Sequence, residues 1–217
     1  TYMDEHGDET GLLRVHVWWP AGNDPLYLAN PEQVEQLVTF TPGGATSAPF
    51  LWIDGIYAAG GSTSQYVPML NVSGWSGAPL TVAVGYDEAA GQIQARVEIL
   101  EPLPPGREYR VRFAITEDDV YAPGPNGETY HDQAFHRLFP DFEGLLLDPD
   151  LGPVQDFAVD APLSEYWTFE NLRATVYVQD PRTRWVLNCG TTFLHEANVA
   201  VEDDGGDATP GDGVPAL

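Results

Sequence analysis

The sequence contains no lysine. Its nine basic residues are all arginines, and they stand against 33 acidic residues, which gives a formal net charge of −24 over 217 residues. A chain this negative repels phosphate backbones and anionic lipid surfaces, so we exclude nucleic acid as a partner. The absence of lysine also excludes Schiff-base chemistry and the lysine of a phosphate-binding loop. The acid excess fits a saline habitat, a high-GC genome or a surface that works with divalent cations, and we favour the last two.

Cysteine is nearly absent too. The single Cys189 has no second thiol with which to form an internal disulfide or to perform thiol oxidoreductase chemistry, so we predict that the protein is not an enzyme of that class. Its parity with Trp185 and Leu187 favours a small, buried apolar residue. No GxSxG turn indicates a serine hydrolase, and the five histidines show no zinc-binding spacing. We expect the histidines to be packing or surface residues.

Long apolar runs are missing as well. No run approaches the roughly 18–20 residues that a membrane-spanning helix needs, so we predict no transmembrane segment. The numbering begins at Thr1 in a polar run without a signal peptide, from which we expect a processed chain. Hydrophobic residues nevertheless make up 43% of the sequence, which is enough to build a core.

Alternating apolar residues are frequent in the second half of the chain. The clearest strand runs from Tyr109 to Thr116, where Val111, Phe113 and Ile115 alternate with polar or small residues, the period of a strand with one buried face. About seven such segments, separated by turns, predict an antiparallel β-sandwich. The segments are residues 80–84, 93–99, 108–116, 145–147, 154–159, 172–178 and 185–189.

The first half of the chain mixes strand and helix signals. The segment Leu12–Trp19 alternates and is followed by a proline, which predicts a strand. Further on, Asn30 has the features of a helix cap and Pro31 those of the first position of a short helix. The same reasoning predicts a strand at 50–53 and a second, weaker helix at 65–72.

Two stretches of the sequence carry a family resemblance. The first is RVHVWWPAGNDPLYLANPEQVEQ with APFLWIDG, and the second is FAITEDDVYAPGPNGETYHDQAFHRLFPDFEG with NLRATVYVQDPRTRWVLN. Together they resemble the outer membrane protein 28-related family, whose members are thioredoxin-like lipoproteins and secreted proteins of bacterial surfaces. The resemblance implies an α+β protein with an incomplete thioredoxin-like lobe (1–77), an Ig-like β-sandwich (78–196) and an acidic C-terminal tail (197–217). It also implies a cis peptide bond before Pro49.

One element of that family is missing from this sequence. Members with a CxxC place it upstream of the strand that ends in His-WWP, and residues 1–10 cannot supply a strand, a thiol pair and a helix. Without the first strand, a thioredoxin-like sheet has a gap between the strands at 12–19 and 50–53, with unpaired backbone groups on both sides. We expect upstream residues, a rearranged local pairing or a strand donated by a neighbouring copy to fill this gap.

Four carboxylates at the end of the 109–116 strand and in its return loop are the best ligand candidates. Glu117, Asp118, Asp119 and Asp132 are hard oxygen donors, and a Pro/Gly loop beside them offers backbone carbonyls. This combination suits calcium, which prefers oxygen ligands. We therefore predict calcium as the candidate cofactor, with a solvated acidic loop as the alternative.

The aromatic content raises the question of a surface glycan as partner. Six tryptophans could line a carbohydrate-binding face. Because Trp18 and Trp19 lie on opposite faces of the predicted strand, we favour packing between the two lobes for them and for Trp52 and Trp75.

From these observations we predict a non-catalytic, extracellular protein of a bacterial outer surface. Ala197, Val199 and Val201 alternate just before the acidic tail. We therefore predict a terminal segment through which copies associate head to tail, into a ring or a filament. The predicted partners are copies of the chain itself, with a surface glycan or another protein as further candidates. The alternative is a degenerate thioredoxin-like binding or redox module that acts on a secreted partner.

Overall fold

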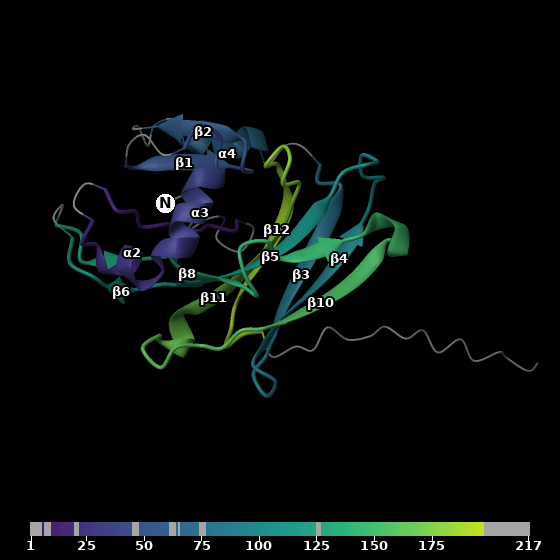
Figure 1. Ribbon diagram of the computed structural model, residues 1–217. Coiled ribbons are helices and arrows are strands. Elements are labelled where there is room, and N and C mark those ends of the chain that lie inside the picture. Colours follow the sequence, from purple (N-terminus) through teal and green to yellow (C-terminus); the bar gives the residue numbers. More distant parts are fainter. Residues whose placement is uncertain are drawn as a thin grey trace, which may run out of the picture.

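The computed structural model describes residues 6, 10–19, 22–44, 48–60, 64, 66–73, 77–124 and 127–197. Over these residues the protein is α+β, with antiparallel sheets and few helices (Figure 1). Two sheets pack face to face as a β-sandwich, and the helix α3 lies against the outer face of one of them. In this described part of the chain, no helix is long and apolar enough to span a bilayer.

The sandwich consists of a small sheet and a large sheet. The small sheet has the strand order β10-β4-β3, with β3 at Leu80–Asp87, β4 at Gln92–Ile99 and β10 at Val154–Asp160. The large sheet has the order β12-β11-β5-β8, and β9 also pairs with β5. Its strands are β5 (Tyr109–Glu117), β8 (Ala134–Phe139), β9 (Leu145–Leu147), β11 (Leu172–Gln179) and β12 (Val186–Phe193). All these pairings are antiparallel, as predicted.

The remaining elements are short. They are α2 (Pro25–Ala29), α3 (Pro31–Phe40), α4 (Tyr66–Ser73), β1 (Phe50–Ile53), β2 (Tyr57–Gly60), β6 (Val120–Tyr121), β7 (Tyr130–His131), η2 (Pro149–Leu151) and η3 (Phe169–Asn171). The helix predicted at 65–72 is confirmed as α4. Helix α2, which the sequence analysis does not predict, is capped by Asp24, whose side chain accepts hydrogen bonds from the Leu26 and Tyr27 N–H groups.

Strand β5 is buried on both faces, whereas the sequence predicts one buried face. Val111, Phe113 and Ile115 face the small sheet and are fully buried. Arg112 and Ala114 point to the opposite side and are buried as well. On that side lies a second core, made of Val34, Val38, Ala114, Phe135, Leu138 and Tyr177. The prediction fails because alternation cannot reveal a further layer over a face that carries arginine and small residues.

Helix α3 is held on the large sheet by side chains of its first turn. Asn30 occupies the N-cap position and Pro31 the start of the helix, as predicted, but the Asn30 side chain makes no capping hydrogen bond. Its Nδ2 donates to the His136 carbonyl at 2.9 Å instead. Gln33 donates to the Leu138 carbonyl at 3.0 Å and accepts the Leu138 N–H at 2.8 Å. Bonds to β8 thus replace a local cap.

The prediction of a strand at Leu12–Trp19 is wrong. Arg14 forms an isolated parallel bridge to β8, in which its N–H donates to the Gln133 carbonyl at 2.9 Å and its carbonyl accepts the Phe135 N–H at 3.0 Å. Leu13, Val15 and Val17 of this segment pack against the second core. The alternation therefore reflects side-chain burial and not a continuous ladder of backbone bonds.

The strand predicted at 50–53 is confirmed as β1, and it pairs with β2 in an antiparallel hairpin. This local pairing supplies a neighbour for β1, which is one of the three ways of filling the expected gap. The hairpin turn contains Asp54 and Gly55, both with positive φ, and it contacts β12, where the Val186 N–H donates to the Asp54 carbonyl at 2.8 Å. The Ala48–Pro49 peptide bond is cis, the isomer expected from the resemblance.

Candidate functional site

The carboxylate of Glu117, the first predicted calcium ligand, accepts hydrogen bonds from other residues of the protein. Glu117 is 5% exposed and accepts hydrogen bonds from His136 Nε2 at 2.6 Å and from the Thr168 N–H at 2.8 Å. Burial raises the pKa of Glu117, but these hydrogen bonds together lower the pKa by more, so it lies below the ordinary value of 4.5. The carboxylate is therefore ionised at neutral pH, and His136 stacks on Trp167 beside it.

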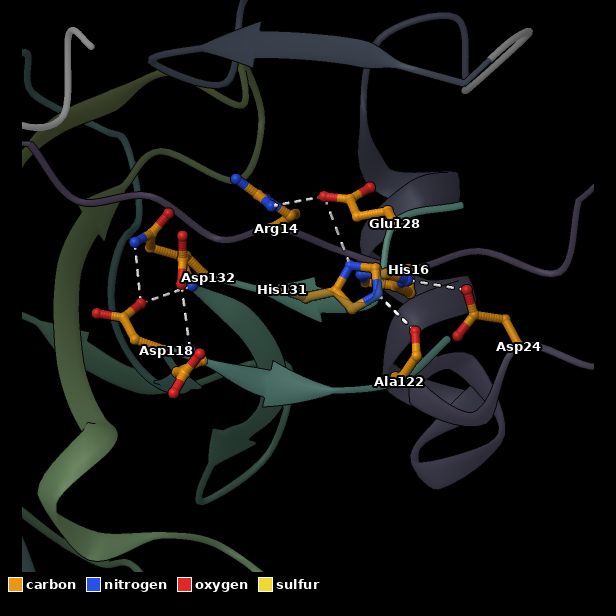
Figure 2. A network of polar contacts seen from close by, with 10 residues as sticks. Arg14, His16, Asp24, Asp118, Ala122, Glu128, His131 and Asp132 are labelled. Carbon is orange, nitrogen blue, oxygen red and sulfur yellow. Dashed lines mark hydrogen bonds and ion pairs between the residues drawn. The ribbon is translucent and has the colours of Figure 1, made fainter. Parts of the chain in front are cut away.

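Two of the other three predicted ligands, Asp118 and Asp132, use their carboxylates to bind neighbouring loop residues (Figure 2). Asp118 Oδ1 accepts the backbone and side-chain N–H groups of Gln133 at 2.7 and 2.9 Å. Asp132 Oδ1 accepts the N–H of Asp119, which has a positive φ of 58°, at 3.1 Å. Among the described residues, no group of three or more His, Cys, Asp or Glu side chains could hold a metal ion. Calcium binding by this set stays a prediction.

Two histidines from distant parts of the chain meet in a junction between the N-terminal segment and β7 (Figure 2). The rings of His16 and His131 lie edge to face, with centroids 4.6 Å apart. His16 Nδ1 binds Asp24 Oδ2, and His131 Nε2 binds the Ala122 carbonyl, both at 2.8 Å. Burial raises the pKa of Asp24, but the bonds from His16 and the helix α2 backbone outweigh it and lower the pKa below 3.8. Both histidines pack inside the fold, and they join the two stretches that carry the family resemblance.

Arg112 is a buried charge that the sequence analysis does not single out. Its side chain is almost completely covered, and the guanidinium lies 4.2 Å from the ring centroid of Phe142 and 4.9 Å from that of Phe40. None of its three guanidinium nitrogens makes a hydrogen bond of good geometry within the described residues. The Tyr177 hydroxyl is a polar neighbour, since burial raises the pKa of Tyr177 and Arg112 lowers it by a smaller amount. Aromatic faces therefore take the place of the carboxylate that normally accompanies a buried arginine. The available signal is an arginine in the middle of the strand that the sequence predicts most clearly.

Cys189 has the surroundings of an unreactive thiol. Burial raises the pKa of the thiol above its ordinary value, which leaves it protonated at neutral pH. Gly11 lies so close that a Cβ at this position would be 2.9 Å from the sulfur. The thiol lines a recess of about 280 Å³ together with Gly11 and residues of β3 and β12. A protonated, partly covered thiol is a poor nucleophile.

Two of the tryptophans are exposed, whereas the sequence analysis predicts that they pack between two lobes. Trp18 and Trp19 are 42% and 58% exposed, because the segment that carries them is not a strand between two lobes. Trp52 packs on Phe50 within the β1–β2 hairpin, and Trp75 lies outside the described residues. A glycan partner for the exposed rings stays a prediction.

Of the predicted assembly residues, Ala197 is the last described residue of the chain, and Val199 and Val201 lie outside the described residues. Ala197 is 6% exposed and belongs to the sandwich core. Its carbonyl accepts the N–H of Tyr86, at the end of β3, at 3.5 Å. Ala197 is therefore part of the fold, and the chain reaches position 197 beside the outer edge of β3.

Comparison with known proteins gives a fold likeness. No family model and no curated protein matches the chain. The fold is similar to that of HBP35 of Porphyromonas gingivalis. That match has a TM-score of 0.67 and 14% identity over 83% of this chain, and it spans 64% of the HBP35 chain, less than two thirds of its length. A domain of the outer membrane lipoprotein Omp28 from the same organism matches at 15% identity and a TM-score of 0.35, over 54% of this chain and 88% of that domain.

Proposed function

We propose that the chain is a non-catalytic protein of a bacterial cell surface, related to the Omp28-related family, that works by associating with copies of itself. The likeness to HBP35 extends over 83% of the chain, so it includes both the sandwich and the residues that cover it. Within this proposal, residues 1–77 correspond to a reduced thioredoxin-like lobe and residues 78–196 to an Ig-like sandwich. The surface location rests on the sequence motifs that resemble the family.

The proposal of a non-catalytic role rests on how the reactive side chains are used. The Cys189 thiol is protonated and partly covered. Glu117 and His136 bind each other inside the large sheet, and His16 and His131 are packed where two segments meet. Glu117 and the three histidines each bind a neighbouring part of the fold, which is a structural use.

Self-association rests on one observation, the position of Ala197. This residue is anchored at the outer edge of the small sheet, through its buried side chain and the bond from Tyr86. The next residues of the sequence, Asn-Val-Ala-Val, are uncharged and alternate in the manner of a strand. A strand-forming segment that starts from a sheet edge is suited to pair with a sheet of another copy.

The test is the mass of the particle in solution. The full chain is compared by sedimentation velocity, from micromolar to millimolar concentration, with a chain that ends at Ala197. Salt near 150 mM is needed, because it screens the repulsion between copies that each carry a net charge of −24. We expect multiples of the monomer mass for the full chain and a monomer for the shortened one. A full chain that stays monomeric at every concentration would refute self-association.

A further inference from the structure

The outer edges of the two sheets differ in how they are covered. In the large sheet, β8 is bridged by Arg14. The edge of β12 lies against β3, where Asn188 Nδ2 donates to the Leu80 carbonyl and a Cβ on Gly190 would be 2.2 Å from the Val82 carbonyl. The same contacts cover the start of the β3 edge, and Ala197 covers its end. Within the described part of the two sheets, β9 and β10 have an outer edge without a strand neighbour, and β10 is the longer of the two, with seven residues against three (Figure 1).

The β10 edge has the backbone geometry of a strand acceptor. At its two ends, the Pro153 carbonyl and the Ala161 N–H bond toward β4, at 2.7 and 2.9 Å. Because backbone direction alternates along a strand, the odd-numbered residues between them face β4 and the even-numbered residues direct their N–H and C=O groups outward. The outward set is Val154, Asp156, Ala158 and Asp160. The register with β4 is unbroken over all seven residues, so no bulge interrupts this edge.

The usual protections of a free edge are weak in β10. Natural edges carry proline, lysine, bulges or inward charges that prevent pairing with another chain. Strand β10 has no proline and no bulge, and its charges point along the sheet surface, where Arg96 binds Asp156 and Gln92 binds Asp160. Leu100, Leu151 and Val154, which lie near one end of β10, are 55%, 76% and 48% exposed. An added strand could cover these apolar groups.

We propose that the β10 edge accepts residues 198–201 of a neighbouring copy as an added strand. This inference rests on the proposed self-association and names the surface that it uses. The donor segment starts beside β3 and the acceptor is β10, and these are the opposite edges of one three-stranded sheet. Donor and acceptor are different surfaces, so the contact is heterologous and repeats head to tail, which continues the small sheet from one copy to the next.

The test uses a proline at the centre of the acceptor edge. The substitution Ala158→Pro removes an outward N–H and leaves the bonds from β10 to β4 in place. As the control, Glu88→Pro places a proline in the exposed β3–β4 turn, outside the β10 edge. We expect Ala158→Pro to remain monomeric at concentrations where the parent and Glu88→Pro associate. Association of Ala158→Pro equal to that of the parent would overturn the assignment of the acceptor.

A peptide-binding measurement separates this proposal from a folding defect and from the proposed function. A fluorescent peptide of sequence NVAVED is titrated into chains that end at Ala197, and the melting temperature of each chain is recorded. We expect saturable binding to the parent and at least tenfold weaker binding to a folded Ala158→Pro. Equal binding to both would overturn the acceptor. Binding lost in Ala158→Pro, together with a full chain that stays monomeric, would support the acceptor and refute self-association. A shortened chain that dimerises through β10 would overturn the donor assignment.

Discussion

The sandwich and the N-terminal region, residues 10–73, use different kinds of contact. Inside the sandwich, β5 and β11 pair without interruption from Leu172↔Glu117 to Gln179↔Arg110. The N-terminal region is attached to the large sheet by apolar packing in the second core, by the side chains of Asn30 and Gln33, by one bridge at Arg14 and by the hairpin turn. From this contrast we expect the sandwich to be self-supporting and the N-terminal region to depend on the surface that the sandwich provides.

The largest expected effect comes from β5, the strand that contributes side chains to both cores. Phe113→Ala removes a fully buried ring between the two sheets. We expect the free energy of unfolding to fall by about 3–5 kcal/mol, since the site cannot collapse around the missing ring. Both regions should unfold together in a denaturant titration followed by tryptophan fluorescence and far-UV circular dichroism. An N-terminal region that stays folded after the sandwich has unfolded would contradict the proposed dependence.

The contact between the two regions is tested at the hairpin turn. A Cβ on Gly55 would lie 2.1 Å from the Arg184 carbonyl, at a φ of 72°. Gly106 has nearly the same φ, 70°, with nothing within 4 Å, so it is a matched control for backbone strain alone. We expect Gly106→Ala to cost about 1 kcal/mol and Gly55→Ala about 2–3 kcal/mol. The excess should appear as faster hydrogen exchange in β1 and β2, and equal costs would show that the turn does not dock.

The pH dependence of the free energy of unfolding should show that the ionised Glu117 carboxylate stabilises the sandwich. Its pKa is below 4.5 in the folded state, so its contribution is fully present above about pH 4.5 and is lost as the pH falls through the folded-state pKa. Glu117→Gln should cost about 2 kcal/mol at neutral pH, because it replaces charge-assisted hydrogen bonds. The difference in stability from the parent should shrink on acidification toward pH 3. A difference that is independent of pH would contradict the assignment.

The smallest expected effect is at Arg112, where the large sheet meets α3. Its guanidinium is buried without a hydrogen bond of good geometry among the described residues, so its desolvation is offset mainly by the rings of Phe40 and Phe142 and by the nearby Tyr177 hydroxyl. Replacement of such a charge by an apolar side chain of similar length is often neutral or stabilising. We expect Arg112→Met to leave the free energy of unfolding unchanged or to raise it by about 1 kcal/mol. A clear loss in urea titration would show that the cation stabilises the junction.

The same contrast explains what could be predicted from the sequence. In the sandwich, each strand pairs with neighbours along its length, so period-two alternation reports backbone structure as well as burial. At Leu12–Trp19 the same alternation reports burial alone, because a single residue finds a backbone partner on β8. Asn30 lies at the N-cap position that the sequence predicts, yet its side chain donates a hydrogen bond to the His136 carbonyl and makes none to the helix backbone. Long-range partners of this kind leave no local signal.

The candidate site residues follow the same rule. The acidic set was found because three of its carboxylates are consecutive in the sequence and the fourth lies in the return loop, and its link to Gln133 spans only 15 residues. The contact between His16 and His131 joins residues that are far apart in the chain, and nothing near either residue predicts it. The free edge of β10 was missed for another reason. A strand is recognised by its own residues, but whether it lies at an edge depends on the order of the strands in the sheet.

The most direct test of the account is hydrogen exchange at the β10 edge. The amides of Asp156, Ala158 and Asp160 point outward in the single chain, so they should exchange quickly in the chain that ends at Ala197. In the full chain, at concentrations where it associates, the same amides should be protected by the added strand, while the exchange of β4 stays unchanged. Equally fast exchange of these three amides in both chains would contradict strand addition at β10.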